Sequence, residues 1–296
     1  MRVRNIIRSS MAAFAILAAA SATPAFAAEC DRACLSGLLT QYVDALVAHD
    51  PSKLPLAGEV RFTEDSHDLK LGEGAWQTIT GKTDFRQDFL DTEKQIAAAH
   101  VGLLEGANPV LYSVVLHVVD SRIAGVEALV QRITPDSRFQ PTELGKPIRG
   151  MDDPVPAGQR MSRQSLIDTA LTYTDGLRRG NFTDAGTPFA PEAYRVENGV
   201  ITAGEGCRIA ATCGLYTQRI MVHPSILASV AAVDEEAGIV LLWMNFGYTD
   251  SYGPGKALVT FEAFKIWGGQ IHSISAFFAT LPISTPRSWP SADPIK

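Results

Sequence analysis

The sequence lacks the short motifs that mark many enzyme and cofactor sites. It contains no G-x-S-x-G elbow, no H-E-x-x-H, no P-loop and no G-x-G-x-x-G after a strand. It also lacks an excess of basic side chains, since 26 Lys and Arg face 32 Asp and Glu, for a net charge of −6. Nucleic-acid binding depends on cations that contact phosphates. We therefore expect no nucleic-acid partner and no cofactor.

The composition is that of a globular protein. Of 296 residues, 46% are hydrophobic and 20% are charged, which excludes disordered, collagen-like and coiled-coil chains. The length fits one large domain or two smaller ones, so internal repetition has to decide between them.

The first 27 residues have the pattern of a secretory signal peptide. Three arginines precede an apolar stretch, 11–20, that is too short to span a bilayer, and Ala25-Phe26-Ala27 is a small-x-small cleavage signal. Cleavage after Ala27 lowers the basic count from 26 to 23 against 32 acids, so the mature net charge is −9. The sequence predicts a soluble secreted or periplasmic protein with no membrane contact after cleavage.

The four cysteines form two close pairs, Cys30 with Cys34 and Cys207 with Cys213. In an exported chain, an even number of closely spaced cysteines favours short-loop disulfides. A zinc site is one alternative, but neither pair has a histidine at the spacing that such a site prefers. Free thiols are the other alternative, above all for Cys30 and Cys34. We expect disulfides and no metal.

Two amphipathic helices open two similar halves. Apolar residues recur every three or four positions over 35–49 and over 162–179, where Ser162 is the expected N-cap and Gly180 the stop. The same kind of segment follows each helix: Val60-Arg61-Phe62-Thr63-Glu64-Asp65 then Gly72-Glu73-Gly74, and Tyr194-Arg195-Val196-Glu197-Asn198-Gly199 then Gly204-Glu205-Gly206.

Paired strands close each half. The turn residues Asp120-Ser121 join 111–119 to 122–130, and Gly268-Gly269 join 257–267 to 270–279. A further strand pair, 227–233 and 238–246, is recognised in the second half only.

A helix followed by a long curved antiparallel sheet, with the helix packed in its concavity, is an α+β cone. The sequence predicts two tandem cones, each with an N-terminal helix. Their expected bounds are 28–134 and 160–284, joined by a Pro- and Gly-rich linker over 135–159 and followed by a C-terminal tail over 285–296.

This order of elements resembles the nuclear transport factor 2-like superfamily, also called the ketosteroid-isomerase-like or SnoaL-like fold. More closely, C-D-R-A-C-L at 30–35, F-A-P-E-A-Y-R-V-E-N-G at 189–199 and E-A-F-K-I-W-G-G-Q-I-H at 262–272 resemble an exported family of tandem cone proteins in bacteria and fungi. The resemblance covers nearly the whole mature chain. It implies a mostly apolar pocket with a few carboxylates, histidines or tyrosines, and acid–base chemistry without cofactors. The superfamily also includes non-catalytic binding proteins.

The second half has two polar residues that the first half lacks, and this difference indicates a functional role for them. His272 is expected on the strand face of Ile274, Ala276 and Phe278, where a lone imidazole is costly, and Glu262 stands on the neighbouring strand. The first half has Ala124 and the region of Val114 there. We therefore predict that His272 and Glu262 are catalytic, with either of them as the base that removes a proton.

Arginine and glutamate recur together in both halves, as Arg61 with Glu64 and Arg195 with Glu197. Each pair fits a structural ion pair, which the repetition favours, or a carboxylate base beside a cation that stabilises developing negative charge. Arg195 is the predicted catalytic cation, and the other three are predicted to bind substrate.

Four further residues are candidates for the substrate pocket. Tyr194 would meet a developing oxyanion, Trp76 would form a wall, and Trp243 is predicted to bind substrate. Trp76 fits a simple core position equally well. His223 precedes Pro224 and also fits a structural turn at the start of a strand.

Two functions remain open. The first is an exported cofactor-independent lyase or isomerase that uses acid–base chemistry on a small, largely apolar molecule, such as an aromatic or carbonyl compound. The second is a non-catalytic protein that binds a small molecule or assembles, as a homo-oligomer would.

Signal cleavage has a direct test. We expect the secreted or periplasmic material to begin at Ala28, because the small-x-small signal ends at Ala27. Intact-mass spectrometry checks this, and a mature mass that still includes residues 1–27 would contradict it.

Overall fold

The computed structural model describes residues 29–142, 144, 148–209 and 212–295, so the predicted signal peptide lies outside the described residues. Among these residues, no helix has the length and apolar character needed to cross a membrane.

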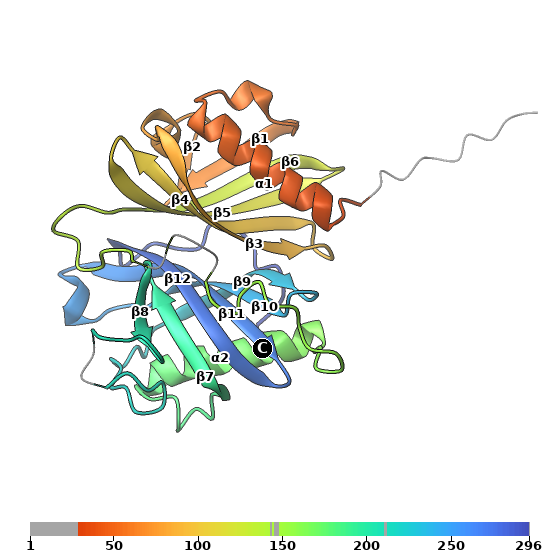
Figure 1. Ribbon diagram of the computed structural model, residues 1–296. Coiled ribbons are helices and arrows are strands. Elements are labelled where there is room, and N and C mark those ends of the chain that lie inside the picture. The colour runs from red at the N-terminus through yellow and green to blue at the C-terminus, as the bar shows by residue number, and fades with distance from the viewer. Residues whose placement is uncertain (1–28, 143, 145–147, 210–211, 296) are drawn as a thin grey trace, which may run out of the picture.

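Two helices and two sheets make up the described chain (Figure 1). The helices are α1 (Arg32–Val47) and α2 (Arg163–Arg179). The first sheet contains β1 (Leu56–Glu64), β2 (His67–Leu69), β3 (Gly81–Asp91), β4 (Ile96–Glu105), β5 (Asn108–Val119) and β6 (Arg122–Arg132). The second contains β7 (Phe189–Glu197), β8 (Val200–Ala203), β9 (Leu227–Asp234), β10 (Ile239–Asn245), β11 (Lys256–Trp267) and β12 (Gln270–Pro282). Short 3-10 turns are η1 (Pro51–Lys53), η2 (Gly74–Gln77) and η3 (Asp250–Tyr252).

The second sheet repeats the strand order of the first. The orders are β2-β1-β6-β5-β4-β3 and β8-β7-β12-β11-β10-β9. Strand β1 runs parallel to β6, and β7 runs parallel to β12, while the other neighbours are antiparallel. The predicted fold class, two tandem α+β cones, is confirmed.

One strand pair that the sequence shows clearly only in the second half is present in both halves. The pair β3–β4 in the first sheet corresponds to β9–β10 in the second, so that strand pair is not confined to the second half. Strand β3 carries charged residues at Asp84, Arg86 and Asp88, and β4 begins with Ile96 and three alanines, which form strands poorly. Tertiary packing forms these strands despite weak local preference.

Capping residues define where the two helices begin and where α2 ends. Asp31 accepts a hydrogen bond from the backbone N of Cys34, and Ser162 accepts one from the backbone N of Ser165, so both are N-caps. Gly180 closes α2 in the left-handed conformation, with φ 75°.

Both predicted disulfides, Cys30–Cys34 and Cys207–Cys213, are formed.

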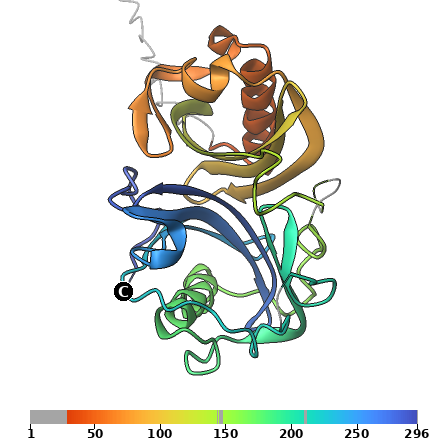
Figure 2. The same cartoon turned by 90° about the vertical axis from the view of Figure 1, so that its left-hand side faces the viewer.

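The two sheets lie back to back, and each helix sits in the concave side of its own sheet (Figures 1 and 2). Between the sheets is a continuous apolar cluster from the convex faces of both halves. Its larger members are Phe85, Phe89, Leu111, Val115, Tyr194, Leu241, Trp243, Phe261 and Phe277. Such packing of two inner faces is the arrangement of a sandwich. Each cone therefore opens away from its neighbour.

Reciprocal ion pairs flank this apolar interface. Arg32, the first residue of α1, pairs with Asp234 at the end of β9, with 2.5 Å between Nη1 and Oδ1. Arg163, the first residue of α2, pairs with Asp91 at the end of β3, with 2.6 Å between Nη2 and Oδ2. Each carboxylate also accepts a backbone N–H from the opposite half, from Leu90 and Val233 respectively. The two halves thus contact each other as a symmetric dimer would.

The predicted C-terminal tail crosses both halves. Arg287 pairs with the buried Glu127 of β6 at 3.0 Å and donates to the Val230 carbonyl of β9. Trp289 donates to the Thr63 hydroxyl and stacks on the ring of His117. Gly125 provides the space, since a Cβ there would lie 2.4 Å from the Trp289 ring.

The interface should control the stability of the whole chain. We expect Phe277→Ala to lower the free energy of unfolding by about 3–5 kcal/mol, the usual cost of truncating a buried aromatic ring. Phe277 is 2% exposed and stacks on His100 of the first half at a centroid distance of 4.4 Å. Urea denaturation followed by fluorescence measures the change.

The control for this experiment is Leu227→Ala, because Leu227 is 58% exposed. Its cost should stay within about 0.5 kcal/mol. A loss below about 1 kcal/mol for Phe277→Ala would show that the halves do not depend on this contact.

Candidate functional site

Strand pairing shows which residues of the two halves are equivalent. Glu64 pairs with Ala128 and Glu197 with Ala276, in each case seven positions after the hairpin turn of the last strand. Ala128 also pairs with Val114, and Ala276 with Glu262. Glu262 therefore replaces Val114, as predicted. The same count aligns Phe62 with Arg195 and Arg61 with Tyr194.

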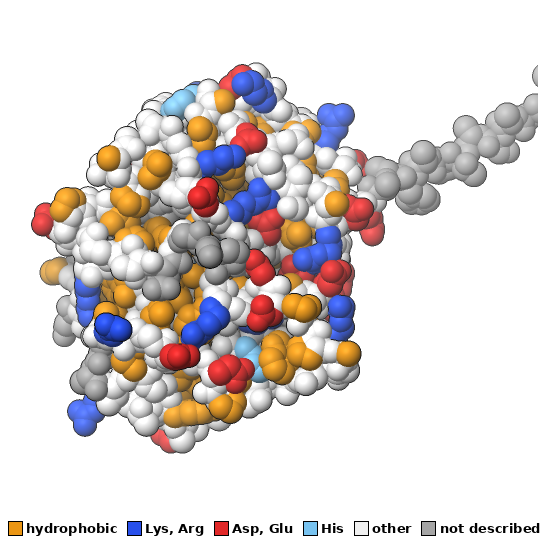
Figure 3. Space-filling view, in the orientation of Figure 1, with side chains coloured by type: hydrophobic (Ala, Val, Ile, Leu, Met, Phe, Trp, Pro, Cys, Tyr) orange, Lys and Arg blue, Asp and Glu red, His pale blue; other side chains and the backbone are white. Residues whose placement is uncertain are grey.

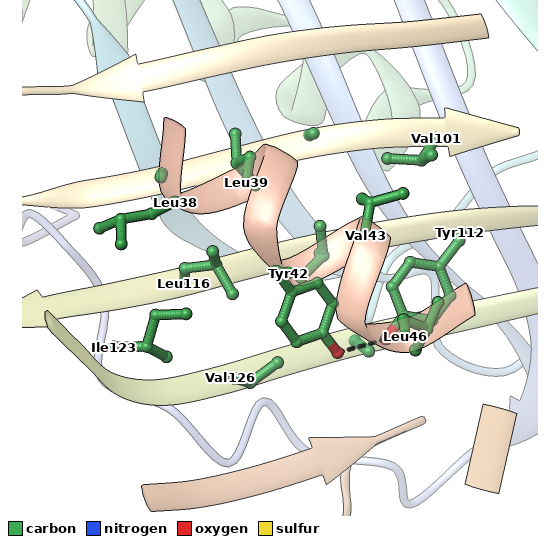
Figure 4. Close-up of a cluster of buried hydrophobic side chains, with 14 of the residues drawn as sticks. Leu38, Leu39, Tyr42, Val43, Leu46, Val101, Tyr112, Leu116, Ile123 and Val126 are labelled. Carbon is green, nitrogen blue, oxygen red and sulfur yellow. Dashed lines mark hydrogen bonds between the residues drawn. The ribbon is translucent and has the colours of Figure 1, made fainter. Parts of the chain in front are cut away.

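The interior of the first cone is filled by its own side chains (Figure 4). The hydroxyl groups of Tyr42 and Tyr112 lie 2.8 Å apart, and the indole N–H of Trp76 donates to Tyr42. Glu64 accepts the backbone N–H of Ala75 at 2.8 Å. We call the three aromatic side chains, Tyr42, Trp76 and Tyr112, the aromatic plug.

The second cone has a charged network where the first has the aromatic plug. Arg195, 6% exposed, donates from Nη1 to the Tyr173 hydroxyl at 3.0 Å and from Nη2 to Gln218 Oε1 at 2.7 Å. Its Nε donates to Thr202 and lies 3.2 Å from Glu197 Oε2. Tyr173 stands eleven residues after its N-cap, as Tyr42 does. These contacts fix the orientation of the Arg195 guanidinium, and its ion pair holds Glu197 at the edge of the network.

Glu262 lies within this network as a second carboxyl group. Its side chain is 1% exposed, and its Oε1 has no hydrogen-bond partner among the described residues. Burial raises the pKa of Glu262 to about 8, and the Glu197 carboxylate raises it too, whereas Arg195 and the Tyr173 hydroxyl lower it in part. At neutral pH, Glu262 is therefore mostly a neutral acid that can donate a proton or a hydrogen bond.

Two cavities lie beside the network, at the mouth of the second cone. We call the first, of about 650 Å³, the apolar cavity; its walls include Ile133, Phe139, Met221, Phe246, Leu258 and Phe278. We call the second, of about 510 Å³, the basic cavity; it includes Arg138, Arg195, Gln218 and Arg219. Glu197, Arg138 and Phe139 line both. Glu197 is thus the carboxylate that a bound molecule would meet.

The disulfide loop replaces the turn that carries Trp76. Gly72-Glu73-Gly74 leads into Ala75 and the buried Trp76, whereas Gly204-Glu205-Gly206 leads into Cys207. Residues 209, 212 and 217–220 form one wall of the basic cavity. This change of loop removes the indole of the aromatic plug from the second cone.

His272 does not lie in the second cone, and the expectation that it shares the face of Ile274 and Phe278 is wrong. The pairing of β12 shifts between Ile271 and Ser273, so His272 is the extra residue of a β-bulge. Ile271 and Ile274 both belong to the core around α2. The ring of His272 stacks on that of Trp267, with 3.4 Å between the ring centroids. Its Nδ1 lies 2.6 Å from Glu192, on the outer side.

The predicted equivalence of Arg61 and Arg195 is also wrong. Arg61 points outward, where it pairs with Asp68 at 2.9 Å and lies over the ring of Trp289. The spacings R-x-x-E and R-x-E differ by one residue, and on a strand one residue changes the face. Only Arg195 of the two faces a cone interior.

The remaining candidates lie at other places. Tyr194 and Trp243 belong to the apolar interface between the halves, and the Tyr194 hydroxyl donates to the carbonyl of Arg149. His223 is buried against Phe246 and Tyr252, and its Nδ1 has no partner among the described residues. Phe246 and Tyr252 line the apolar cavity, whereas His223 packs against these two side chains and does not line the cavity itself.

Other features of the site were not expected from the sequence. Arg138 and Phe139 fall in the predicted linker, and Gln218 lies after the disulfide, so no periodic pattern marks them. Tyr173 had a usable signal, since it repeats Tyr42 at the same distance from the N-cap. Among the described residues, no three His, Cys, Asp or Glu side chains are grouped to hold a metal ion.

The match to a protein-family model covers the second half of the chain. A family model described as "Domain of unknown function (DUF8021)" matches residues 159–278, which include Arg195, Glu197 and Glu262. No curated protein shows a significant match. A solved structure described as a "putative ketosteroid isomerase" from Kribbella flavida DSM 17836 is similar, with 22% identity over 40% of this chain and 97% of that chain and a TM-score of 0.29.

The raised pKa of Glu262 predicts how stability depends on pH. The pKa is about 8 in the folded protein against an ordinary 4.5, so the stabilising effect of the neutral acid is complete below about pH 4.5 and is lost as pH rises through 8. We expect Glu262→Gln to gain stability relative to the wild type across this range, by at most about 1.4 kcal/mol per pH unit. Urea denaturation at a series of pH values measures it.

Glu59→Gln is the control, because that side chain is exposed and makes no ion pair among the described residues. Its stability should stay within about 0.5 kcal/mol of the wild type at each pH. If the difference for Glu262→Gln is equally constant, Glu262 is ionised in the folded protein and the assignment is wrong.

Proposed function

We propose that the second cone is a cofactor-independent acid–base site for a small, largely apolar carbonyl compound, and that the protein is an isomerase or lyase. The observation that carries this proposal is the pair of unlike carboxyl groups, Glu197 at the cavities and Glu262 behind it, held around Arg195. Two carboxyl groups in different environments are the usual basis for a division into base and acid.

In this proposal, Glu197 is the base. Its carboxylate takes a proton from the carbon next to the substrate carbonyl, and the electron pair moves to the carbonyl oxygen to form an enolate. Arg195 lines the basic cavity, where it holds Glu197 in position and its guanidinium supports the negative charge on the enolate oxygen. Glu262 and Tyr173 lie behind Arg195, and Glu262 adds no second negative charge there while it is neutral. Return of the proton to another carbon completes an isomerisation, and expulsion of a leaving group completes an elimination.

The proposal and the prediction from the sequence name different residues as the catalytic base. His272 was predicted as a base, but a bulge separates it from the network. Glu262 and Arg195 keep their predicted importance, and Glu197 moves from substrate binding to proton transfer. The alternative, a binding protein without catalysis, uses the same two cavities and requires no proton transfer.

The compartment is part of the proposal. Two disulfides lie in the described chain, and such bonds persist where the surroundings are oxidising. Figure 3 shows acidic and basic side chains interspersed on one face, with no broad area of basic charge there. Both features fit the predicted exported protein that has no nucleic-acid partner.

Proton transfer can be measured without the natural substrate. We expect the wild type to accelerate the exchange of benzylic hydrogen for deuterium in phenylacetone, followed by proton NMR in deuterated buffer. Glu197→Gln should slow this exchange about 10²- to 10⁴-fold, the usual effect of removing a positioned base. The wild-type rate should also fall as pH rises through about 8, where Glu262 loses its proton.

Glu64→Gln is the matched control, since Glu64 occupies the equivalent position beside the aromatic plug of the first cone. It should leave the exchange rate within about twofold. If the wild type binds phenylacetone without accelerating exchange, the binding protein is the better description.

A further inference from the structure

We propose that the ligand of the second cone is a small carboxylic acid, bound as its anion. Its apolar or aromatic body would occupy the apolar cavity, and its carboxylate would be held by Arg138 and Arg219 in the basic cavity. This rests on the proposed function, because it names the substrate class of the same site.

The two cavities have opposite chemistry and share one boundary. Six of the 14 residues that line the apolar cavity are phenylalanine, leucine, isoleucine or methionine, and Tyr252 adds a further aromatic ring. Three arginines line the basic cavity, and Glu197 is the single carboxylate among its lining residues. A molecule that crosses the boundary at Phe139 would place its middle atoms beside Glu197. The arrangement fits a molecule with an apolar end and an anionic end.

The charges at the boundary do not cancel. Arg195 is paired with Glu197 at 3.2 Å. Among the described residues, no carboxylate lies within ion-pair distance of Arg138 or Arg219, and both side chains are exposed. Asp136 and Glu205 occur nearby in the sequence, but neither lines a cavity at this mouth. Two cations are therefore available to an anionic ligand.

This local charge is opposite to that of the whole chain. The full sequence has a net charge of −6, so a non-specific attraction for anions is not expected. Unpaired arginines at the opening of a mostly apolar cavity attract an anion to that opening and can hold a carboxylate by two parallel N–H donors. An uncharged apolar ligand would make no use of them.

A short crossing segment positions one of these cations. The ring of Phe139 packs edge-on against Phe278 of β12, with centroids 5.2 Å apart. Nearby, the backbone N–H of Thr142 donates to the carbonyl of Gly199 in the β7–β8 turn. These contacts hold Arg138 at the boundary of the two cavities, where it lines both.

Two probes that differ in one group test the proposal. Phenylpyruvate carries a carboxylate where phenylacetone carries a methyl group, and both have the same ring and ketone. We expect the wild type to bind phenylpyruvate more tightly by titration calorimetry at physiological salt. The double variant Arg138→Gln/Arg219→Gln should weaken phenylpyruvate binding about 10- to 100-fold and leave phenylacetone binding within about twofold.

Arg122→Gln is the charge control, because Arg122 is an exposed residue at the start of β6. It should leave both affinities unchanged. Equal binding of the two probes, unchanged phenylpyruvate binding by the double variant, or no phenylpyruvate binding at millimolar concentration would overturn the proposal.

Exchange measurements separate this proposal from the proposed function. If binding of phenylpyruvate depends on the two arginines but Glu197→Gln does not alter exchange, the anion site stands and the catalytic role of Glu197 fails. If Glu197→Gln slows exchange in phenylacetone but the arginines do not affect phenylpyruvate binding, the catalytic role stands and the anion site is wrong.

Discussion

The packing of two curved sheets on their convex faces determines the geometry of the whole protein. It buries apolar side chains from both halves in one cluster, and the two reciprocal pairs, Arg32–Asp234 and Arg163–Asp91, close its edges. Because the two carboxylates are fully buried, loss of either arginine would leave a costly unpaired charge. With the convex faces occupied in this way, each cone opens outward, and a ligand can enter a cone without disturbing the contact between the halves.

The same fold has two different interiors. In the first cone, Phe62, Val114 and the aromatic plug complete an apolar core. In the second, Arg195 and Glu262 occupy the positions of Phe62 and Val114. Burial of a guanidinium and a carboxyl group does not stabilise the fold by itself, since the cost of desolvation generally offsets the attraction between such groups. The first cone shows that the fold does not require them, and this difference supports a chemical role for the second cone.

The sequence predicted the architecture well because helix caps, hairpin turns and apolar periodicity are local signals. Gly268-Gly269 and Asp120-Ser121 have the positive φ angles that such turns need. It predicted the site only in part. Glu262 was found from the difference between the halves, whereas Arg195 was found from an arginine–glutamate repeat that the strand register does not support. The assignment of His272 depended on strict alternation along β12, which the bulge interrupts. Arg138 and Phe139 contact the second cone only through the tertiary fold, and no local pattern carries that information.

The central claim is that the second cone holds a neutral carboxylic acid beside an ionised one. Infrared difference spectroscopy between the wild type and Glu262→Gln measures this most directly, because the carbonyl stretch of a protonated carboxyl group is separate from the bands of a carboxylate. The account predicts a protonated carboxyl band at pH 7 that is absent from the variant and disappears from the wild type as pH rises through about 8. A difference spectrum at pH 7 that contains only carboxylate bands would contradict it.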